Sequence, residues 1–113
     1  MKNINVTFFS SSTSRVGKII TLSQVLSDFR TGRYAEAIEN LRQVLVEEGP
    51  IAYSTAKKNL PAIAFCGEFS GGHAKSNIVK YNDIMIIDID HISEDDMLRV
   101  RECLMSDEYV FSF

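Results

Sequence analysis

The chain has 113 residues, of which 45% are hydrophobic and 24% are charged, and its formal net charge is -3. This is enough for one small domain with a core, and it excludes both a disordered chain and a chain of two domains. The net negative charge excludes a protein that binds duplex DNA over its whole surface. Any contact with nucleic acid then needs a local basic patch or a bound metal ion.

The first elements expected along the chain are a strand and a capped helix. Alternating apolar and polar residues over 4–8 predict a half-buried strand, and the serine-rich stretch 10–14 predicts the loop that ends it. Thr21 and Gln24 have the spacing of a helix-capping box, and Gly32 suits the end of that helix. The residues expected on its inward face are Leu22, Val25, Leu26 and Phe29.

Two further helices are expected before the middle of the chain. One is predicted over residues 34–48 and a short one over 51–58, because Gly49-Pro50 separates them. The inward stripe of the longer helix is expected to hold Ile38, Leu41 and Leu45.

The second half of the chain alternates between strand-like and helix-like patterns. Residues 62–66 predict a short buried strand, and 70–80 form the least regular stretch. The continuously apolar run 84–90 is typical of a central strand that is covered on both faces. Ser93 is expected to cap a helix over 94–105, with Met97, Val100 and Leu104 inward. A further strand is expected over 109–113, and its position at the end of the chain indicates a piece of a longer protein.

The two cysteines and the termini bear on the compartment. Cys66 and Cys103 lie in apolar stretches and match no zinc-binding or redox spacing, so we expect both to be small core residues. Residues 1–6 hold one basic residue and no long apolar run, which argues against a secretory signal. No apolar stretch approaches the roughly 18 residues that a membrane span needs. The sequence therefore predicts a soluble, cytoplasmic protein with no membrane partner.

Asp88 and Asp90 are the residues that best suit chemistry. Residues two apart on a strand point to the same face, so both carboxylates are expected to project together beyond Ile84 and Ile86. Carboxylates about 7 Å apart repel each other, and a divalent cation resolves this repulsion. Oxygen ligands favour Mg²⁺ or Mn²⁺. Phosphatases with an aspartate nucleophile share an Asp-x-Asp pattern, but Ile92 stands where they have threonine.

Each candidate residue also has a plain structural explanation. The two aspartates can be solvated acids where a strand becomes a loop, and His91 can be a surface or capping residue. His73 lies in a glycine-rich loop and is expected to be exposed. Lys57 is a candidate contact to a nucleotide phosphate, although lysine is also common at the solvated end of a helix.

The motifs together resemble a known family. They are Thr21-Leu22-Ser23-Gln24-Val25, the helix with Arg42, Lys57-x-x-Leu60-Pro61-Ala62, Gly67-x-Phe69 and Ile86-Ile87-Asp88-Ile89-Asp90-His91. In this order they resemble the N-terminal domain of virulence-associated protein E, which is found in mobile elements and is similar to the archaeo-eukaryotic primase superfamily. The resemblance implies that Asp88 and Asp90 are catalytic metal ligands. It also implies a Ser-x-His motif and a third acidic ligand, which are expected beyond Phe113.

The sequence thus predicts one domain over residues 1–113, the N-terminal fragment of a longer primase-like protein. The expected fold is α/β, with N-terminal helices packed on a small mixed sheet and the start of an RRM-like β-α-β unit. The longer protein is expected to be a replication nucleotidyltransferase that uses two metal ions, a nucleotide and DNA, and that carries a downstream helicase-type ATPase domain. The fragment alone is expected to be inactive. The alternative is a non-catalytic DNA-binding or partner-docking domain in which the two aspartates are structural.

Overall fold

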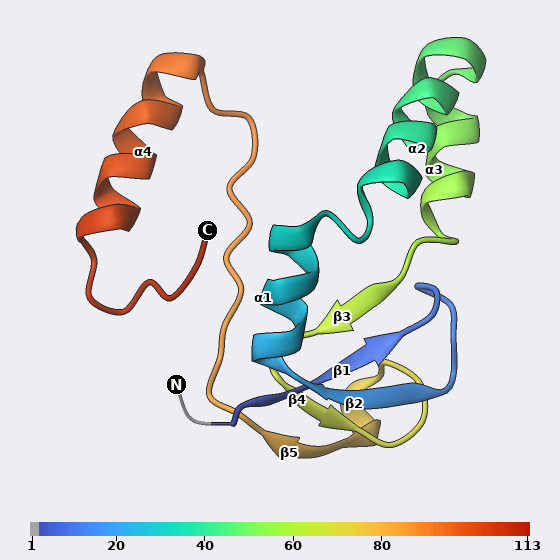
Figure 1. Cartoon of the computed structure of the whole chain (residues 1–113), viewed down its shortest axis with the longest axis vertical. Coiled ribbons are helices and arrows are strands. Elements are labelled where there is room, and N and C mark those ends of the chain that lie inside the picture. The colour runs from blue at the N-terminus through green and yellow to red at the C-terminus, as the bar shows by residue number, and fades with distance from the viewer. Residues whose placement is uncertain (1–2) are drawn as a thin grey trace.

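The computed structural model describes residues 3–113 and shows a mixed α/β fold, as expected (Figure 1). In chain order the elements are β1 (Asn5–Phe9), β2 (Gly17–Thr21), α1 (Leu22–Thr31), α2 (Ala35–Glu48), α3 (Pro50–Lys57), β3 (Ala62–Ala64), β4 (Gly67–Phe69), a 3-10 turn (Lys75–Asn77), β5 (Ile78–Tyr81) and α4 (Glu94–Ser106). The first two residues of the stretch considered for a secretory signal lie outside the described residues. No helix within residues 3–113 is long and apolar enough to cross a membrane.

The strands form two small sheets, and the strand pairing in both is antiparallel. The larger sheet has the order β2-β1-β3, and β4 pairs with β5 in the smaller one. The expected mixed sheet is therefore not found among the described residues. Antiparallel neighbours need only short connections, which this chain supplies between β4 and β5.

The central strand β1 is covered on both of its faces. On one face Val6 packs with Leu22 and Val25 of α1, and all three side chains are buried. On the other face Phe9 packs with Phe69 of β4 and with Ala64 of β3. Since alternate residues of a strand point to opposite faces, β1 separates two apolar clusters.

Thr7 joins the two sheets on this second face. Its side chain is fully buried, and its hydroxyl donates to the carbonyl of Gly67 at 2.9 Å. The same oxygen accepts from the backbone N–H of Phe69 at 3.0 Å. One hydroxyl thus satisfies two buried backbone groups of β4, and this fixes the position of the smaller sheet.

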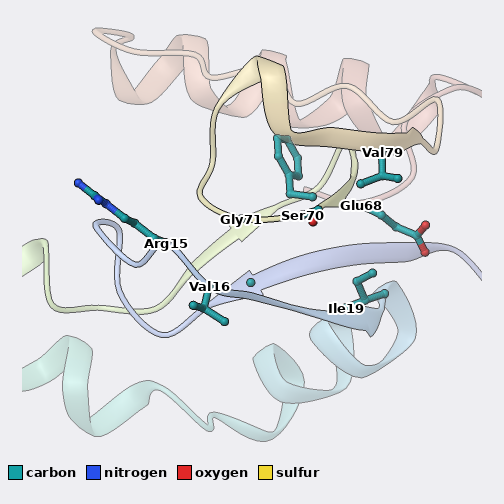
Figure 2. A pocket seen from close by; sticks show the side chains of 9 residues that line it. Arg15, Val16, Ile19, Glu68, Ser70, Gly71 and Val79 are labelled. Carbon is teal, nitrogen blue, oxygen red and sulfur yellow. The ribbon is translucent and has the colours of Figure 1, made fainter.

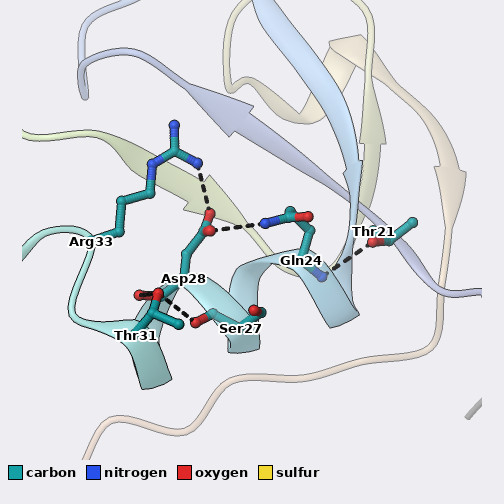
Figure 3. A network of polar contacts seen from close by, with 6 residues as sticks. All are labelled: Thr21, Gln24, Ser27, Asp28, Thr31 and Arg33. Atoms are coloured by element: carbon teal, nitrogen blue, oxygen red, sulfur yellow. Dashed lines mark hydrogen bonds and ion pairs between the residues drawn. The ribbon is translucent and has the colours of Figure 1, made fainter.

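The prediction for α1 is confirmed at both ends. The hydroxyl of Thr21 accepts from the backbone N–H of Gln24 at 3.2 Å, and Gly32 ends the helix in the left-handed region at φ 72°. The Gln24 side chain does not complete the expected capping box. It donates instead to the buried carboxylate of Asp28, which also pairs with Arg33 at 3.0 Å (Figure 3). Of the expected inward residues, Leu22 and Val25 are buried, while Phe29 is exposed.

Helices α2 and α3 pack against each other as a helical hairpin (Figure 1). Gly49 adopts φ 91° between them, and Pro50 begins α3, where its missing N–H costs no helical hydrogen bond. Of the expected inward stripe only Leu41 is buried, whereas Ile38 and Leu45 are 40% and 42% exposed.

Three strands were not predicted. These are β2, β4 and β5, which have between three and five residues each. They carry little apolar alternation, and their pairing partners select them rather than their own sequence. The strand expected over 62–66 is shorter, ending at Ala64.

Two expected strands are not found, and several residues expected in the core, among them Met97 and Cys103, are exposed. Residues 84–90 and 109–113 form no ladder with any described strand, so the expected β-α-β unit has only its helix. The prediction of a covered central strand at 84–90 is wrong, because no neighbouring strand lies there to receive its hydrogen bonds. Helix α4 has no buried residue, although its cap is as expected, with Ser93 accepting from Asp96 at 3.1 Å. Cys66 is half-buried, whereas Cys103 is exposed.

Candidate functional site

The segment of residues 84–90 carries the two aspartates and is exposed over most of its length. It leaves the core at Ile84, which still packs against the cluster of Val6, Leu22 and Val25. Beyond that point the apolar side chains face solvent, with Met85 79% and Ile87 71% exposed. In Figure 1 the segment appears as an extended trace between β5 and α4, with no arrow.

Asn82 fixes the point at which this segment leaves the folded part. Its side-chain amide donates to the carbonyls of Asn5 and Phe65, and its oxygen accepts from the N–H of Ile84 at 3.0 Å. After Ile84, no backbone group of residues 85–90 makes a hydrogen bond within the described chain. The direction of the segment is thus set at one end only.

Asp88 and Asp90 are both exposed, and neither makes a hydrogen bond or an ion pair within residues 3–113. The expectation that both side chains reach solvent is therefore met, although not from a strand. No group of three or more metal-ligating side chains gathers anywhere in the described part of the chain. Two free carboxylates fit a Mg²⁺ ion, which is commonly held by one or two carboxylates while water and substrate phosphates fill its other positions.

The other candidate residues lie apart from this pair. Lys57 is the last residue of α3 and is exposed, and no ion pair joins it to either aspartate within the described chain. His91 is exposed at φ 56°, which places it in the turn that leads toward α4. His73 is exposed as expected, yet its ring packs edge-on against Phe69 at 4.9 Å between centroids.

The sequence-based prediction missed a groove between the loop that precedes β2 and the loop that joins β4 to β5. Arg15 and Gly71 line both halves of this groove, and Figure 2 shows one half of it. Charge is also segregated along the chain. Residues 5–27 and 50–82 hold six Lys or Arg and one Glu, whereas residues 83–113 hold two Arg and nine Asp or Glu. The whole-chain net charge concealed this pattern.

The fold is thus that of a small α/β domain with two antiparallel sheets and an acidic C-terminal portion. The chain belongs to the family of BT4734-like N-terminal domains, which matches residues 55–113. That match covers β3, β4, β5, the segment with the aspartates and α4. No curated protein and no solved structure shows a significant match to the chain.

This membership corrects the resemblance inferred from the sequence motifs. The matching family is not the virulence-associated protein E N-terminal domain, and the relation to the primase superfamily is likewise unsupported. The resemblance was built on short motifs, and two of them, Thr21–Val25 and the helix with Arg42, lie before the first matched residue. Leu-Pro-Ala and Asp-x-Asp are too short to identify a family alone. What remains of the functional prediction is the chemistry of the residues themselves.

Proposed function

We propose that this chain contributes Asp88 and Asp90 as two carboxylate ligands of a Mg²⁺ or Mn²⁺ site for nucleotidyl transfer. The observation that carries the proposal is that both carboxylates are exposed and free of any hydrogen bond or ion pair in the described chain. A buried acid with a structural role has donors that satisfy it, as Asp28 has in Gln24 and Arg33, whereas water alone solvates the exposed Asp88 and Asp90. The two free acids are better suited to an external cation.

The only chemical role proposed for this chain is to bind the divalent cation through its two carboxylates. A divalent cation supplies neutralisation of phosphate oxygens during phosphoryl transfer. Asp88 and Asp90 lie two residues apart on an exposed segment without strand pairing, so the proposal requires this segment to turn both carboxylates toward one cation or two adjacent cations. The proposal also requires further ligands for the cation, and it includes a nucleotide and DNA as binding partners. The helicase-type ATPase and the replication role followed from the corrected resemblance alone and stay untested predictions.

The alternative function is a non-catalytic binding domain whose aspartates are structural, either bonded within the chain or solvated where the extended segment becomes a loop. Their lack of partners within the described chain argues against the bonded form, and the metal-binding assay separates the ligand role from that of solvated acids. The alternative keeps one observation in its support, which is the basic half of the chain described above. That half does not include either aspartate.

Metal binding to the chain tests the proposal directly. Mn²⁺ is paramagnetic, so it broadens the amide resonances that lie near it. We expect millimolar Mn²⁺ to broaden residues 86–91 in the wild type, with weak affinity because only two carboxylates are present. Asp88→Asn and Asp90→Asn should each raise the dissociation constant at this segment about tenfold or more, since either change leaves one ligand.

Asp95→Asn is the matched control, because Asp95 is an exposed acid at the start of α4 with two acidic neighbours. It should leave the broadening of residues 86–91 unchanged. Equal effects of all three substitutions would show diffuse attraction of a cation to acidic surface, and the proposal would fail.

In chelator, Asp88→Asn should leave the melting temperature unchanged or slightly higher, because like-charge repulsion is relieved. A marked loss of stability there would instead assign Asp88 a structural role. We expect the 113-residue chain by itself to incorporate no labelled nucleotide.

A further inference from the structure

The groove that the sequence did not predict has two halves, which are lined by different parts of the fold. One half has a volume of about 550 Å³ and is lined mainly by the loop that precedes β2 and the loop between β4 and β5. The other half, of about 350 Å³, lies over β2, β4 and β5. Arg15 and Gly71 border both, so the halves adjoin. A methyl group on Gly72 would contact Cα of Arg15 at 3.6 Å, which shows how closely the two loops approach.

The larger half is rich in free hydrogen-bond donors. Within the described chain, the backbone N–H groups of Thr13, Arg15, Gly71, Gly72 and His73 donate no hydrogen bond. The guanidinium of Arg15 also has no ion pair there. Gly71 has φ +97°, a conformation that L side chains rarely adopt, so the turn of this loop depends on a glycine there. Successive free N–H groups beside an arginine form an anion-binding concavity.

No carboxylate opposes these donors. The lining of the larger half contains no Asp or Glu, and the first acidic residue of the chain is Asp28 in α1. Lys75 lies in the 3-10 turn that follows the same loop, and Lys18 lies on β2. Glu68 lines the other half, where it accepts a hydrogen bond from Asn5 at 2.7 Å. An anion in the larger half therefore meets positive charge and free donors together.

The smaller half offers an exposed apolar wall. Ile19 of β2 and Val79 of β5 face each other across it, with Val16 near Arg15 (Figure 2). Val79 is 68% exposed, which leaves most of its surface available for contact. Phe69 lines the same half and is fixed by its packing with Phe9. Ligand sites commonly combine such an apolar wall with a few placed polar groups.

We propose that this groove binds a nucleoside phosphate, with the phosphate in the larger half and the base against Ile19 and Val79. The loops that hold the phosphate use Arg15 and the free amides of Gly71 and Gly72. The carboxylate of Glu68 lies beside the apolar wall, where it can accept from an exocyclic amine. The nucleoside phosphate is either a free nucleotide or one unit of a single strand. The site does not include Asp88 or Asp90 and does not rest on the function proposed for them.

Binding of three probes in chelator tests the site without any metal. The probes are dATP, a fluorescent single-stranded oligonucleotide and inorganic tripolyphosphate. We expect dATP or the oligonucleotide to bind more tightly than tripolyphosphate, because only they reach the apolar wall. Tighter binding of dATP assigns a free nucleotide, and tighter binding of the oligonucleotide assigns a strand. In both cases the amide resonances of Gly71 and Gly72 should shift.

Substitutions separate the two halves. Arg15→Gln should weaken all three probes about tenfold, since it removes a charge-assisted contact to phosphate. For the oligonucleotide it should also reduce the salt slope by about 1. The double change of Ile19→Thr with Val79→Thr should weaken dATP and the oligonucleotide about threefold and leave tripolyphosphate unaffected. Both strand positions keep β-branched residues, so the fold is retained.

Arg99→Gln is the matched control, because Arg99 is exposed on α4 and has no ion pair in the described chain. It should change no affinity. Equal losses of affinity from Arg15→Gln and Arg99→Gln would show that the probes are attracted non-specifically. Absence of binding by every probe would also overturn the proposed site. A dATP affinity no better than that of tripolyphosphate, unchanged by the threonine pair, would refute the nucleoside assignment. Asp88→Asn should leave all three affinities unchanged, which separates this site from the metal proposal.

Discussion

Residues 3–82 and residues 83–113 differ in how much buried apolar surface stabilises them. The buried residues of the two core clusters all lie in the first region, in β1, α1, β3 and β4. The second region has no buried residue, and its exposed apolar side chains include Met85, Ile87 and Leu98. Both regions have well-capped helices, since α1 and α4 each start at a hydroxyl that accepts a backbone N–H. Local capping therefore forms a helix in either region, but only the first region stabilises its helix by burial.

Removal of a buried leucine should have the largest effect. Leu22 is 3% exposed and packs with Val6 and Val25. Leu22→Ala should lower the free energy of unfolding by about 4 kcal/mol, because the lost burial and the cavity add together. Urea denaturation followed by circular dichroism measures it, with the denaturant slope as the check that the unfolded state is unchanged. A loss below about 1 kcal/mol would show that this cluster is not the core of the domain.

Loss of the hydroxyl that joins the two sheets should have a slightly smaller effect. Thr7→Val keeps the shape of the side chain and leaves the carbonyl of Gly67 and the N–H of Phe69 without partners. Each buried backbone group costs about 1–3 kcal/mol when unpaired, so we expect a total of about 3 kcal/mol. Thr7→Ser retains the hydroxyl and serves as the control. The bridge would be disproved if the serine variant were the less stable of the two.

The smallest effect is expected in the second region. Leu104 lies on α4 and is half-buried, in contrast to Leu22. Leu104→Ala should cost less than about 1 kcal/mol, because little apolar surface is exchanged there. Amide hydrogen exchange should agree, with α4 exchanging through local opening and β1 only through global unfolding. Equal costs for Leu22→Ala and Leu104→Ala would remove the difference between the regions.

The sequence predicted the elements whose signals are local. The hydroxyl of Thr21 and the glycine at position 32 bound α1 as expected, and Ser93 starts α4. Helices α2 and α3 separate at Gly49 and Pro50 because these residues suit a helix end and a helix start. The capping box was only half right, because Asp28 competes for the Gln24 side chain. That competition involves Arg33, which the spacing rule did not consider.

Of the candidate sites, exposure was predicted and arrangement was not. The exposure of Asp88, Asp90 and Lys57 follows from their charge, and the structure agrees with it. The groove lined by Arg15 and Gly71 could not be derived from spacing, since its two loops are more than fifty residues apart in sequence. The uneven distribution of charge along the chain did not point to it either, because Arg15 is the basic residue among its lining residues.

The sequence by itself determined the approximate helix limits and the position of β1, whereas the short motifs pointed to the wrong family. The tertiary structure decided which extended segments became strands. Residues 84–90 have a stronger β-pattern than β4 or β5, yet β4 and β5 pair with each other while 84–90 pairs with no described strand. A helix closes its hydrogen bonds within its own segment, so local sequence largely specifies it. A strand closes them on a neighbour, so its formation depends on what the fold places beside it.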